Sequence, residues 1–220
     1  MLQRTPEPEL MDLPHEADAY ARADFSDVNQ RFVDRLLEVC STQNALRVVD
    51  LGTGPADIPI RIARARPAWT ITAVDAAQAM LDIAAREIAS AGLDKQITLV
   101  LADAKKTVLP AASFDLVCSN SILHHVADAQ AFWREAKRLL KPGGVVFLRD
   151  LFRPASEEQA RAIVRQHAGK ESALLQEEFF RSLLAAYTPG EIREQLSAAG
   201  LDGLTVQTIS DRHVDVFGRV

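Results

Sequence analysis

The chain has 220 residues, 48% of them hydrophobic, which suits one domain with a continuous core. Its formal net charge is −5 and no block of Lys or Arg stands out, so we expect no nucleic-acid partner. The two cysteines are isolated, and the sequence contains neither a signal-peptide pattern nor an apolar run of about 18 residues. We therefore expect a cytoplasmic protein with no disulfide framework, no bound metal and no membrane segment; the sequence does not specify an oligomeric state.

The chain begins with an irregular segment followed by a helical pattern. Residues 1–14 carry three prolines and mixed charges, which predicts an irregular lead-in. Across residues 15–41 the apolar side chains recur mostly at helical spacing, and Ser26 and Asp27 are candidate caps between two helices. This segment is predicted to form an N-terminal helical arm.

Residues 47–151 alternate between short β-rich runs and helical stretches. The β-rich runs are RVVDLG, TITAVD, ITLVLAD, FDLVCSN and GVVFLRDL, and the helical stretches cover residues 56–65, 78–91 and 129–140. Such alternation is typical of a parallel sheet with helices on both faces. The sequence therefore predicts an α/β core over this range.

The last third of the chain changes character. Residues 152–188 are predicted to form a helical lid after the fifth strand, because residues 155–186 show a long helical pattern without a strand candidate. Residues 189–220 are predicted to contain a helix, with Pro189 in its first turn and Gly200 at its end, and then the strands LTVQTIS and HVDVFGRV. Together these parts predict a single domain over residues 1–220.

The segment VVDLGTGPADIPI, residues 48–60, takes a buried strand into a Gly52-Thr53-Gly54 turn and then into a helix. Glycines allow a sharp turn and close approach of a ligand, and the start of the helix offers unpaired N–H groups. Asp75 ends the second strand 21 residues beyond Gly54, where a carboxylate can accept hydrogen bonds from both hydroxyls of a ribose. A plain tight turn and a helix N-cap at Asp75 are the alternatives. Together the features favour an adenosine-containing cofactor.

Among adenosine-containing cofactors, the residue at position 57 argues against the dinucleotides. Asp57 stands where a dinucleotide-binding fingerprint has its third glycine, and its carboxylate would be repelled by a pyrophosphate. This counts against NAD or FAD. An NAD-dependent Rossmann-type oxidoreductase or epimerase, and a non-catalytic scaffold with the same fold, remain the alternative interpretations.

Five segments resemble, in order and spacing, the motifs of class I (Rossmann-like) S-adenosylmethionine-dependent methyltransferases. They are VVDLGTGPADIPI, AVDAAQAML, LADAKKTVLP, FDLVCSNSILHHV and RLLKPGGVVFLRD. The resemblance spans about residues 47–151, and the two final strands extend it. It implies an α/β fold with a seven-stranded, mostly parallel sheet, helices on both faces and an antiparallel last strand. It also implies S-adenosylmethionine as cofactor, bound across the carboxyl ends of the first strands, and S-adenosylhomocysteine as product.

The resemblance assigns the cofactor-binding residues by position. The turn at Gly52, Thr53 and Gly54 would approach the methionine portion, Asp75 would hold the ribose, and Asp103 with Ala104 would meet the adenine. The predicted cofactor site also contains Asp50, Ala76, Met80 and Asn120. For Met80 a place in the core is the stronger interpretation, and for Asp103 a strand-end cap is the alternative.

His124 and His125 follow the fourth strand, at the rim where an acceptor should bind. An imidazole titrates near neutral pH, so both are candidate catalytic residues, with His124 preferred as a general base for an acceptor that must lose a proton. Alternatively, the histidines orient the loop or cap the helix that begins near Asp128. Substrate binding is predicted for residues outside the shared sheet, Tyr20, Phe25, Asp150, Arg153 and Phe179. Arg153 suits a carboxylate or phosphate; a salt bridge within the protein at Asp150 and packing of the lid aromatics are the alternatives.

Two subclasses are disfavoured by missing motifs. The sequence Asn/Asp-Pro-Pro-Tyr/Phe, typical of methyltransferases acting on nucleic-acid bases or glutamine, is replaced by Ser119-Asn120-Ser121-Ile122. The several cysteines of an arsenite methyltransferase are also missing. The remaining prediction is methylation of an O, N, S or C atom on a small or medium-sized acceptor molecule.

Overall fold

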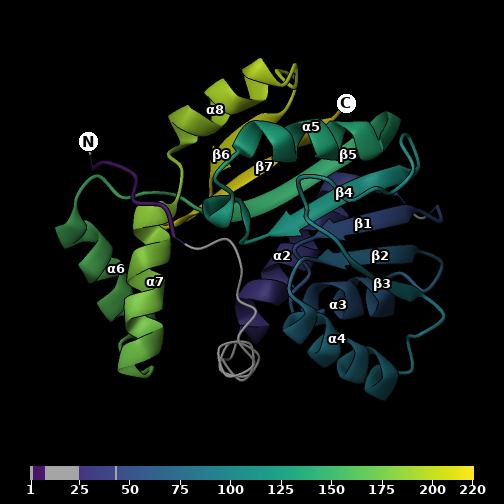
Figure 1. The fold of residues 1–220 in the computed structure, drawn as a ribbon, viewed down its shortest axis with the longest axis horizontal. Helices are drawn as coiled ribbons and strands as arrows, with labels where there is room; N and C mark the ends of the chain where they lie inside the picture. The colour runs from purple at the N-terminus through teal and green to yellow at the C-terminus, as the bar shows by residue number, and fades with distance from the viewer. Residues whose placement is uncertain (1, 8–24, 43) are drawn as a thin grey trace.

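The computed structural model describes residues 2–7, 25–42 and 44–220. In this part of the chain, seven strands form one sheet in the order β3-β2-β1-β4-β5-β7-β6 (Figure 1). The first five run parallel: β1 (Arg47–Leu51), β2 (Thr70–Asp75), β3 (Ile97–Leu101), β4 (Phe114–Asn120) and β5 (Leu140–Leu151). β7 (His213–Arg219) is antiparallel to both β5 and β6 (Thr205–Thr208). The predicted fold class, a mostly parallel Rossmann-like sheet, is confirmed.

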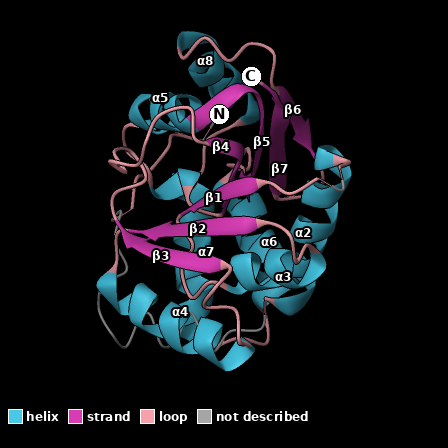
Figure 2. Cartoon of the chain, turned by 90° about the vertical axis from the view of Figure 1, so that its right-hand side faces the viewer, coloured by secondary structure: helices cyan, strands magenta, loops and turns pink. Residues whose placement is uncertain are grey.

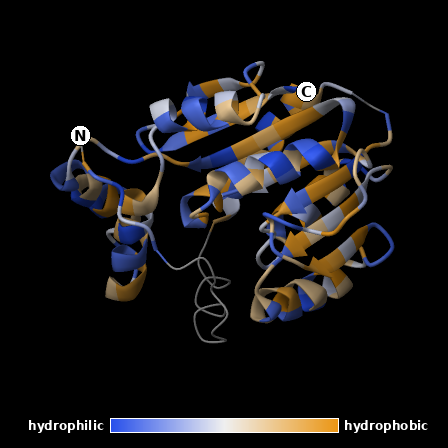
Figure 3. Cartoon of the chain, turned by 45° about the horizontal axis from the view of Figure 1, so that its top comes forward, coloured by the Kyte–Doolittle hydropathy of each residue, from blue (hydrophilic) through white to orange (hydrophobic). Residues whose placement is uncertain are grey.

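Helices cover both faces of the sheet (Figure 2). One face packs against α2 (Ser26–Cys40), α3 (Asp57–Ala65) and α4 (Gln78–Ala91), and the other against α5 (Ala129–Leu139) and α8 (Pro189–Ala198). The central strands are buried from both sides, which is why they read as nearly continuous apolar runs. Figure 3 shows this hydrophobic character along the strands. Among the described residues, no helix combines the length and hydrophobicity that a membrane span requires.

Local capping chemistry sets several helix boundaries. Asp128 accepts a hydrogen bond from the Ala131 N–H at 3.0 Å and starts α5. Thr188 and Glu191 form a reciprocal capping box at the start of α8, with Pro189 in the first turn, and Gly200 follows the helix with φ +65°. Because these signals are local, the sequence located both helices closely. At α2, however, the N-cap is Phe25 without a side-chain hydrogen bond, so the predicted capping by Ser26 or Asp27 is wrong.

The predicted lid contains two helices rather than one continuous pattern. α6 (Glu157–Ala168) and α7 (Ala173–Ala185) are separated by residues 169–172, and each begins after a serine whose hydroxyl caps it, Ser156 and Ser172. The helices pack on each other through apolar side chains that include Ile163, Phe180 and Leu183. They form a hairpin that stands apart from the helices covering the sheet (Figure 1).

Residues 2–7 run along this hairpin. Thr5 donates its N–H to the carbonyl of Leu184 at 3.1 Å, and the Arg4 guanidinium lies 4.0 Å from the ring centre of Tyr187. These six residues contain no helix or strand, as predicted for the lead-in. The rest of the predicted lead-in, and the part of the predicted helical arm before Phe25, including Tyr20, lie outside the described residues.

A buried ion pair joins the parallel part of the sheet to its antiparallel edge. Arg149 of β5 donates two hydrogen bonds to the carboxylate of Asp215 on β7, from Nε at 2.6 Å and from Nη2 at 2.8 Å. The two residues face each other in the β5–β7 register, and Asp215 is fully buried. This bidentate geometry fixes the alignment of the two strands.

Replacing Asp215 should therefore be costly, because it leaves the Arg149 guanidinium buried without its partner. We expect Asp215→Ala to lower the free energy of unfolding by about 3–5 kcal/mol in urea denaturation. The exposed Asp202→Ala is the control and should change it by less than about 0.5 kcal/mol. Equal losses in the two variants would contradict the role given to the ion pair.

Candidate functional site

The carboxyl ends of β1, β2, β3 and β4 meet at one edge of the sheet, where the glycine turn leaves β1. The N–H groups of Gly52 and Thr53 donate to the carbonyl of Val74 at 2.8 and 2.9 Å. The Gly54 N–H donates to Asp75 Oδ2 at 2.7 Å, and the Ala77 N–H donates to Asp75 Oδ1 at 2.9 Å. Asp75 therefore joins the glycine turn to Ala77, the residue before α4; because Ala77 is the N-cap of α4, the alternative prediction that Asp75 caps this helix is wrong.

The two glycines of the turn are required for different reasons. Both have left-handed backbone angles, with φ +77° at Gly52 and +54° at Gly54. A Cβ atom on Gly52 would lie 2.3 Å from Cγ2 of Ile122, whereas one on Gly54 would meet no described atom within 4 Å. No sequence motif marks Ile122, which packs against Gly52. The open space beside Gly54 is where a ligand can approach the backbone.

Asp50 lies inside the protein beside β4. It is 2% exposed, and the Cys118 thiol lies 3.5 Å from its Oδ1. Burial raises the pKa of Asp50 to about 6. Asp50, a predicted cofactor residue, therefore lies in the protein interior and not on the open side of the sheet edge where the carboxyl ends of the strands meet.

The predicted adenine-contacting residues follow β3. The strand ends at Leu101, two residues earlier than its sequence pattern indicates, and Asp103 lies in a turn. Its carboxylate accepts the Lys105 N–H at 2.8 Å and pairs with Lys105 Nζ at 3.1 Å, which is the capping alternative. Ala104 is half-buried in the same turn.

Glu135 of α5 holds the far side of that turn. Its Oε1 accepts hydrogen bonds from the N–H and the hydroxyl of Thr107, at 2.9 and 2.5 Å. Burial opposes ionisation, but hydrogen bonds from Arg138 and Thr107 outweigh it and lower the pKa of Glu135 below its ordinary value. The ionised carboxylate therefore anchors the segment that follows Asp103.

Two further predicted cofactor residues flank the start of α4. Met80 is 5% exposed in a small apolar cluster with Ala77 and Ile83, so the core interpretation describes its position. Ala76, in contrast, is exposed directly after Asp75. Of the two, Ala76 is the one whose surface a ligand can reach.

Asn120 ends β4 and is linked by hydrogen bonds to α2 and α3. Its side-chain amide donates to Asn29 Oδ1 at 3.3 Å, and the Asn29 amide donates to Asp57 Oδ2 at 2.8 Å. Arg61 also donates to Asp57 Oδ2 at 2.8 Å. Asn29 carries no recognisable signal in the sequence, because no local pattern connects a residue of α2 to the end of β4. The network holds the Asp57 carboxylate at the position where a dinucleotide-binding fingerprint has its third glycine.

The predicted catalytic histidines form a short 3-10 turn, η1 (Leu123–His125), after β4. His124 is 4% exposed, and its Nδ1 lies 2.5 Å from Oδ1 of the buried Asp150 on β5. The His124 N–H also donates to Asp150 Oδ2 at 3.2 Å. Burial opposes protonation, but Asp150, aided by Glu7, raises the pKa of His124 above its ordinary value. Asp150 thus orients the imidazole. This agrees with the alternative prediction that Asp150 forms a salt bridge within the protein.

Glu7 completes this cluster from the N-terminal segment. Its Oε1 lies 3.6 Å from His124 Nε2 and 3.4 Å from His125 Nδ1, and its side chain is 12% exposed. Burial raises the pKa of the Glu7 carboxyl. Arg4 holds the segment in place, donating to the carbonyls of His124 at 2.9 Å and Ala185 at 2.6 Å. No motif marks Glu7 or Arg4 in the sequence.

The guanidinium of Arg153, a predicted substrate-binding residue, is bonded within the protein, and the residue also lines a cavity. It is 7% exposed, and its guanidinium donates to the carbonyls of Leu2 and Ala186, at 2.9 and 2.7 Å, and to Glu191 Oε1 at 2.7 Å. These are tertiary contacts, because the N-terminal segment and the segment before α8 meet at Arg153. Phe179 packs half-buried on the α6–α7 hairpin, and Phe25 is half-buried before α2.

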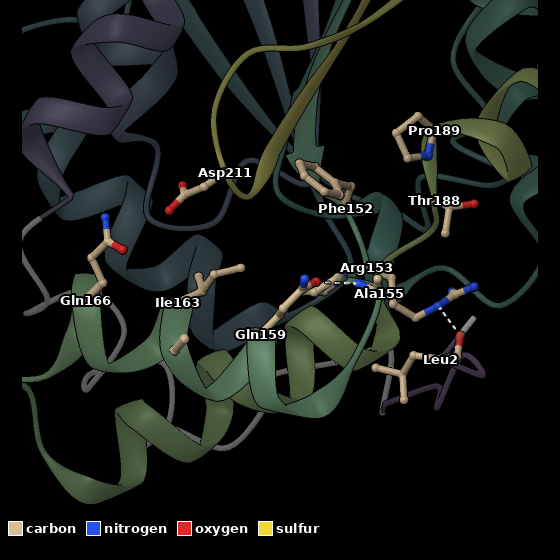
Figure 4. A pocket seen from close by; sticks show the side chains of 12 residues that line it. Leu2, Phe152, Arg153, Ala155, Gln159, Ile163, Gln166, Thr188, Pro189 and Asp211 are labelled. Carbon is tan, nitrogen blue, oxygen red and sulfur yellow. Dashed lines mark hydrogen bonds between the residues drawn. The ribbon is translucent and has the colours of Figure 1, made fainter.

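A cavity of about 570 Å³ adjoins Arg153, between α6 and the start of α8 (Figure 4). Most of its lining is apolar, from residues such as Leu2, Phe152, Ile163 and Pro189. None of the residues of the glycine turn or of the predicted cofactor site lines it. The cavity is therefore separate from the predicted cofactor site at the carboxyl ends of the strands.

The amino-acid sequence of this chain is similar to those of known methyltransferases. Residues 49–148 match the family model of a methyltransferase domain. A 27-O-demethylrifamycin SV methyltransferase from Amycolatopsis mediterranei is 28% identical over 189 residues, 86% of this chain and 65% of that protein. A release factor glutamine methyltransferase from Gloeobacter violaceus is 39% identical over 109 residues, 50% of this chain and 38% of its own. The chain thus spans less than two thirds of either relative.

The fold has a counterpart of the same extent among solved structures. A crystal structure from Methanococcus maripaludis, of a protein described as an S-adenosyl-L-methionine-dependent methyltransferase, superposes with a TM-score of 0.76 at 20% identity. The superposition covers 97% of this chain and 95% of that one. The likeness in fold therefore extends well beyond residues 49–148.

The contact between Gly52 and Ile122 makes a specific prediction about stability. Gly52→Ala places a methyl group against Ile122 in a left-handed backbone position, and should lower the free energy of unfolding by about 2–4 kcal/mol. Gly92→Ala is the matched control, because Gly92 has φ +69° but no described atom within 4 Å of an added Cβ. It should cost about 1 kcal/mol. Denaturant unfolding of both variants measures the difference, and the absence of one would refute the steric role of Ile122.

Proposed function

We propose that this chain is a class I S-adenosylmethionine-dependent methyltransferase and that it methylates a small or medium-sized acceptor molecule; the match of residues 49–148 to a methyltransferase-domain model supports the proposal. The observation that carries the proposal is the glycine turn bonded to Asp75 at the carboxyl ends of β1 and β2. A turn of this kind brings backbone N–H groups and a carboxylate to one place. This pairing suits an amino-acid portion and a ribose in the same ligand.

The residues present fit the cofactor. Among the described residues, no atom lies within 4 Å of a Cβ placed on Gly54, and Ala76 is exposed next to Asp75. The Asp75 carboxylate, which accepts the N–H groups of Gly54 and Ala77, ends β2 at the position where a carboxylate can bind ribose hydroxyls. We assign Asp75 to the ribose, the turn at Gly52, Thr53 and Gly54 to the methionine portion, and Asp103 with Ala104 to the adenine.

Catalysis in this proposal is mainly alignment. When bound, S-adenosylmethionine supplies a methyl group already activated on a sulfonium, so the protein needs only to hold a nucleophile in line with it. Correct orientation of two reactants recovers roughly 7–11 kcal/mol of barrier. Asn120, at the end of β4, and η1 form the side on which we place the acceptor. Asp150 fixes His124 there, with Nδ1 toward the carboxylate and Nε2 toward Glu7.

The first acceptor class to test is a hydroxylated small molecule. The relative from Amycolatopsis mediterranei is named for 27-O-demethylrifamycin SV, an O-methylation acceptor. Glutamine is a weaker candidate despite the second relative, because Ser119-Asn120-Ser121-Ile122 stands where the glutamine-specific sequence would be. The network of Asp57 with Arg61 and Asn29 argues against the alternative dinucleotide cofactor.

The role of Asp75 gives a direct test of the proposal. Asp75→Ala should weaken S-adenosylmethionine binding at least tenfold, since losing about 1.4 kcal/mol already has that effect. Asp82→Ala, on the exposed side of α4, is the control and should bind as the wild type does. Isothermal titration measures both, with circular dichroism to verify folding. Unchanged affinity in folded Asp75→Ala would overturn the assignment.

A further inference from the structure

We propose that Glu7, His124 and His125 form a binding site for one divalent transition-metal ion of the zinc type. Each offers one donor atom, and the three donor atoms lie within 4.8 Å of one another. Two histidines and a glutamate are a ligand set that zinc sites use. The proposal does not depend on methyl transfer, and it concerns residues that the cofactor assignment leaves out.

The distances fit metal ligands better than hydrogen bonds. Glu7 Oε1 lies 3.6 Å from His124 Nε2 and 3.4 Å from His125 Nδ1. Good N–H···O hydrogen bonds have donor–acceptor distances of about 2.7–3.2 Å. Ligand atoms bound to zinc at about 2.1 Å in tetrahedral geometry are roughly 3.4 Å apart. Two of the three distances between ligand atoms therefore match a tetrahedral site, and the third is within 4.8 Å.

Asp150 prepares His124 for this role. Because Asp150 Oδ1 lies 2.5 Å from His124 Nδ1, the neutral imidazole carries its proton on Nδ1 and its lone pair on Nε2. Nε2 is the atom that faces Glu7. A carboxylate bonded to the other nitrogen of a metal-binding histidine is a recurring arrangement, which fixes the ring and raises its basicity.

Glu7 provides an independent observation. Its Oε1 is buried and has no hydrogen-bond partner among the residues that the structure describes. A buried carboxylate oxygen without a partner is costly, and native proteins rarely leave one. A cation between Glu7 and the two rings would satisfy it. Arg4 keeps Glu7 at this position by bonding to the carbonyls of His124 and Ala185.

The site would link segments that are far apart in the chain. Glu7 belongs to the N-terminal segment, the histidines to η1 after β4, and Asp150 to β5. Three protein ligands leave a fourth position for water or a ligand, as in catalytic zinc sites. A metal on His124 Nε2 also takes the lone pair that a general base would use, so the two roles exclude each other.

The test is metal binding by the full chain, without an affinity tag and after treatment with a chelator. Titration with Zn²⁺ should show one equivalent bound, and Co²⁺ should give the visible absorption of a tetrahedral site. Glu7→Gln and His125→Asn should each weaken Zn²⁺ binding at least tenfold. Asp150→Asn should weaken it by about 10–100-fold through its effect on His124.

His167→Asn is the matched control, since His167 Nε2 also pairs with a carboxylate, Asp211 at 2.7 Å, but on the surface. It should bind Zn²⁺ as the wild type does. Failure of the wild type to bind, or undiminished binding by folded Glu7→Gln and His125→Asn, would overturn the proposal. Titration of the chelator-treated protein with S-adenosylmethionine, run in parallel, reports on the proposed function separately.

Discussion

The site depends on the hydrogen bonds that tie the β1–α3 turn to the end of β2. Gly52 and Thr53 bond to the Val74 carbonyl, and Gly54 bonds to the Asp75 carboxylate. Because β1 and β2 run parallel, their carboxyl ends reach the same edge, and a turn leaving one strand can be fixed by the next. Ile122, just beyond β4, closes the turn from the other side. Three strands thus determine the position of one loop.

The other half of the strand-end region is assembled over long distances in sequence. Residues 2–7 run along the α6–α7 hairpin and bring Glu7 to the histidines of η1, while Asp150 reaches His124 from β5. Arg153 supports the same region from within, by joining Leu2, Ala186 and Glu191. A buried arginine with three such partners stabilises the meeting of the N-terminal segment, the hairpin and α8.

The sequence predicts what is set locally. The β-rich runs and helical patterns locate the strands and most helices, and the strand–glycine–helix segment identifies the turn around Gly52. What it misses is tertiary. The helical periodicity continues across residues 169–172 although the chain turns there. Asn29, Ile122 and Glu7 acquire their roles only through contacts with distant strands, and Arg153 finds its partners in the same way.

The most direct test of the central claim is isothermal titration of the purified protein with S-adenosylmethionine, S-adenosylhomocysteine and NADH in parallel, because it needs no knowledge of the acceptor. The protein should bind the first two ligands with micromolar affinity and should not bind NADH. Binding of NADH alone, or of none of the three, would contradict it.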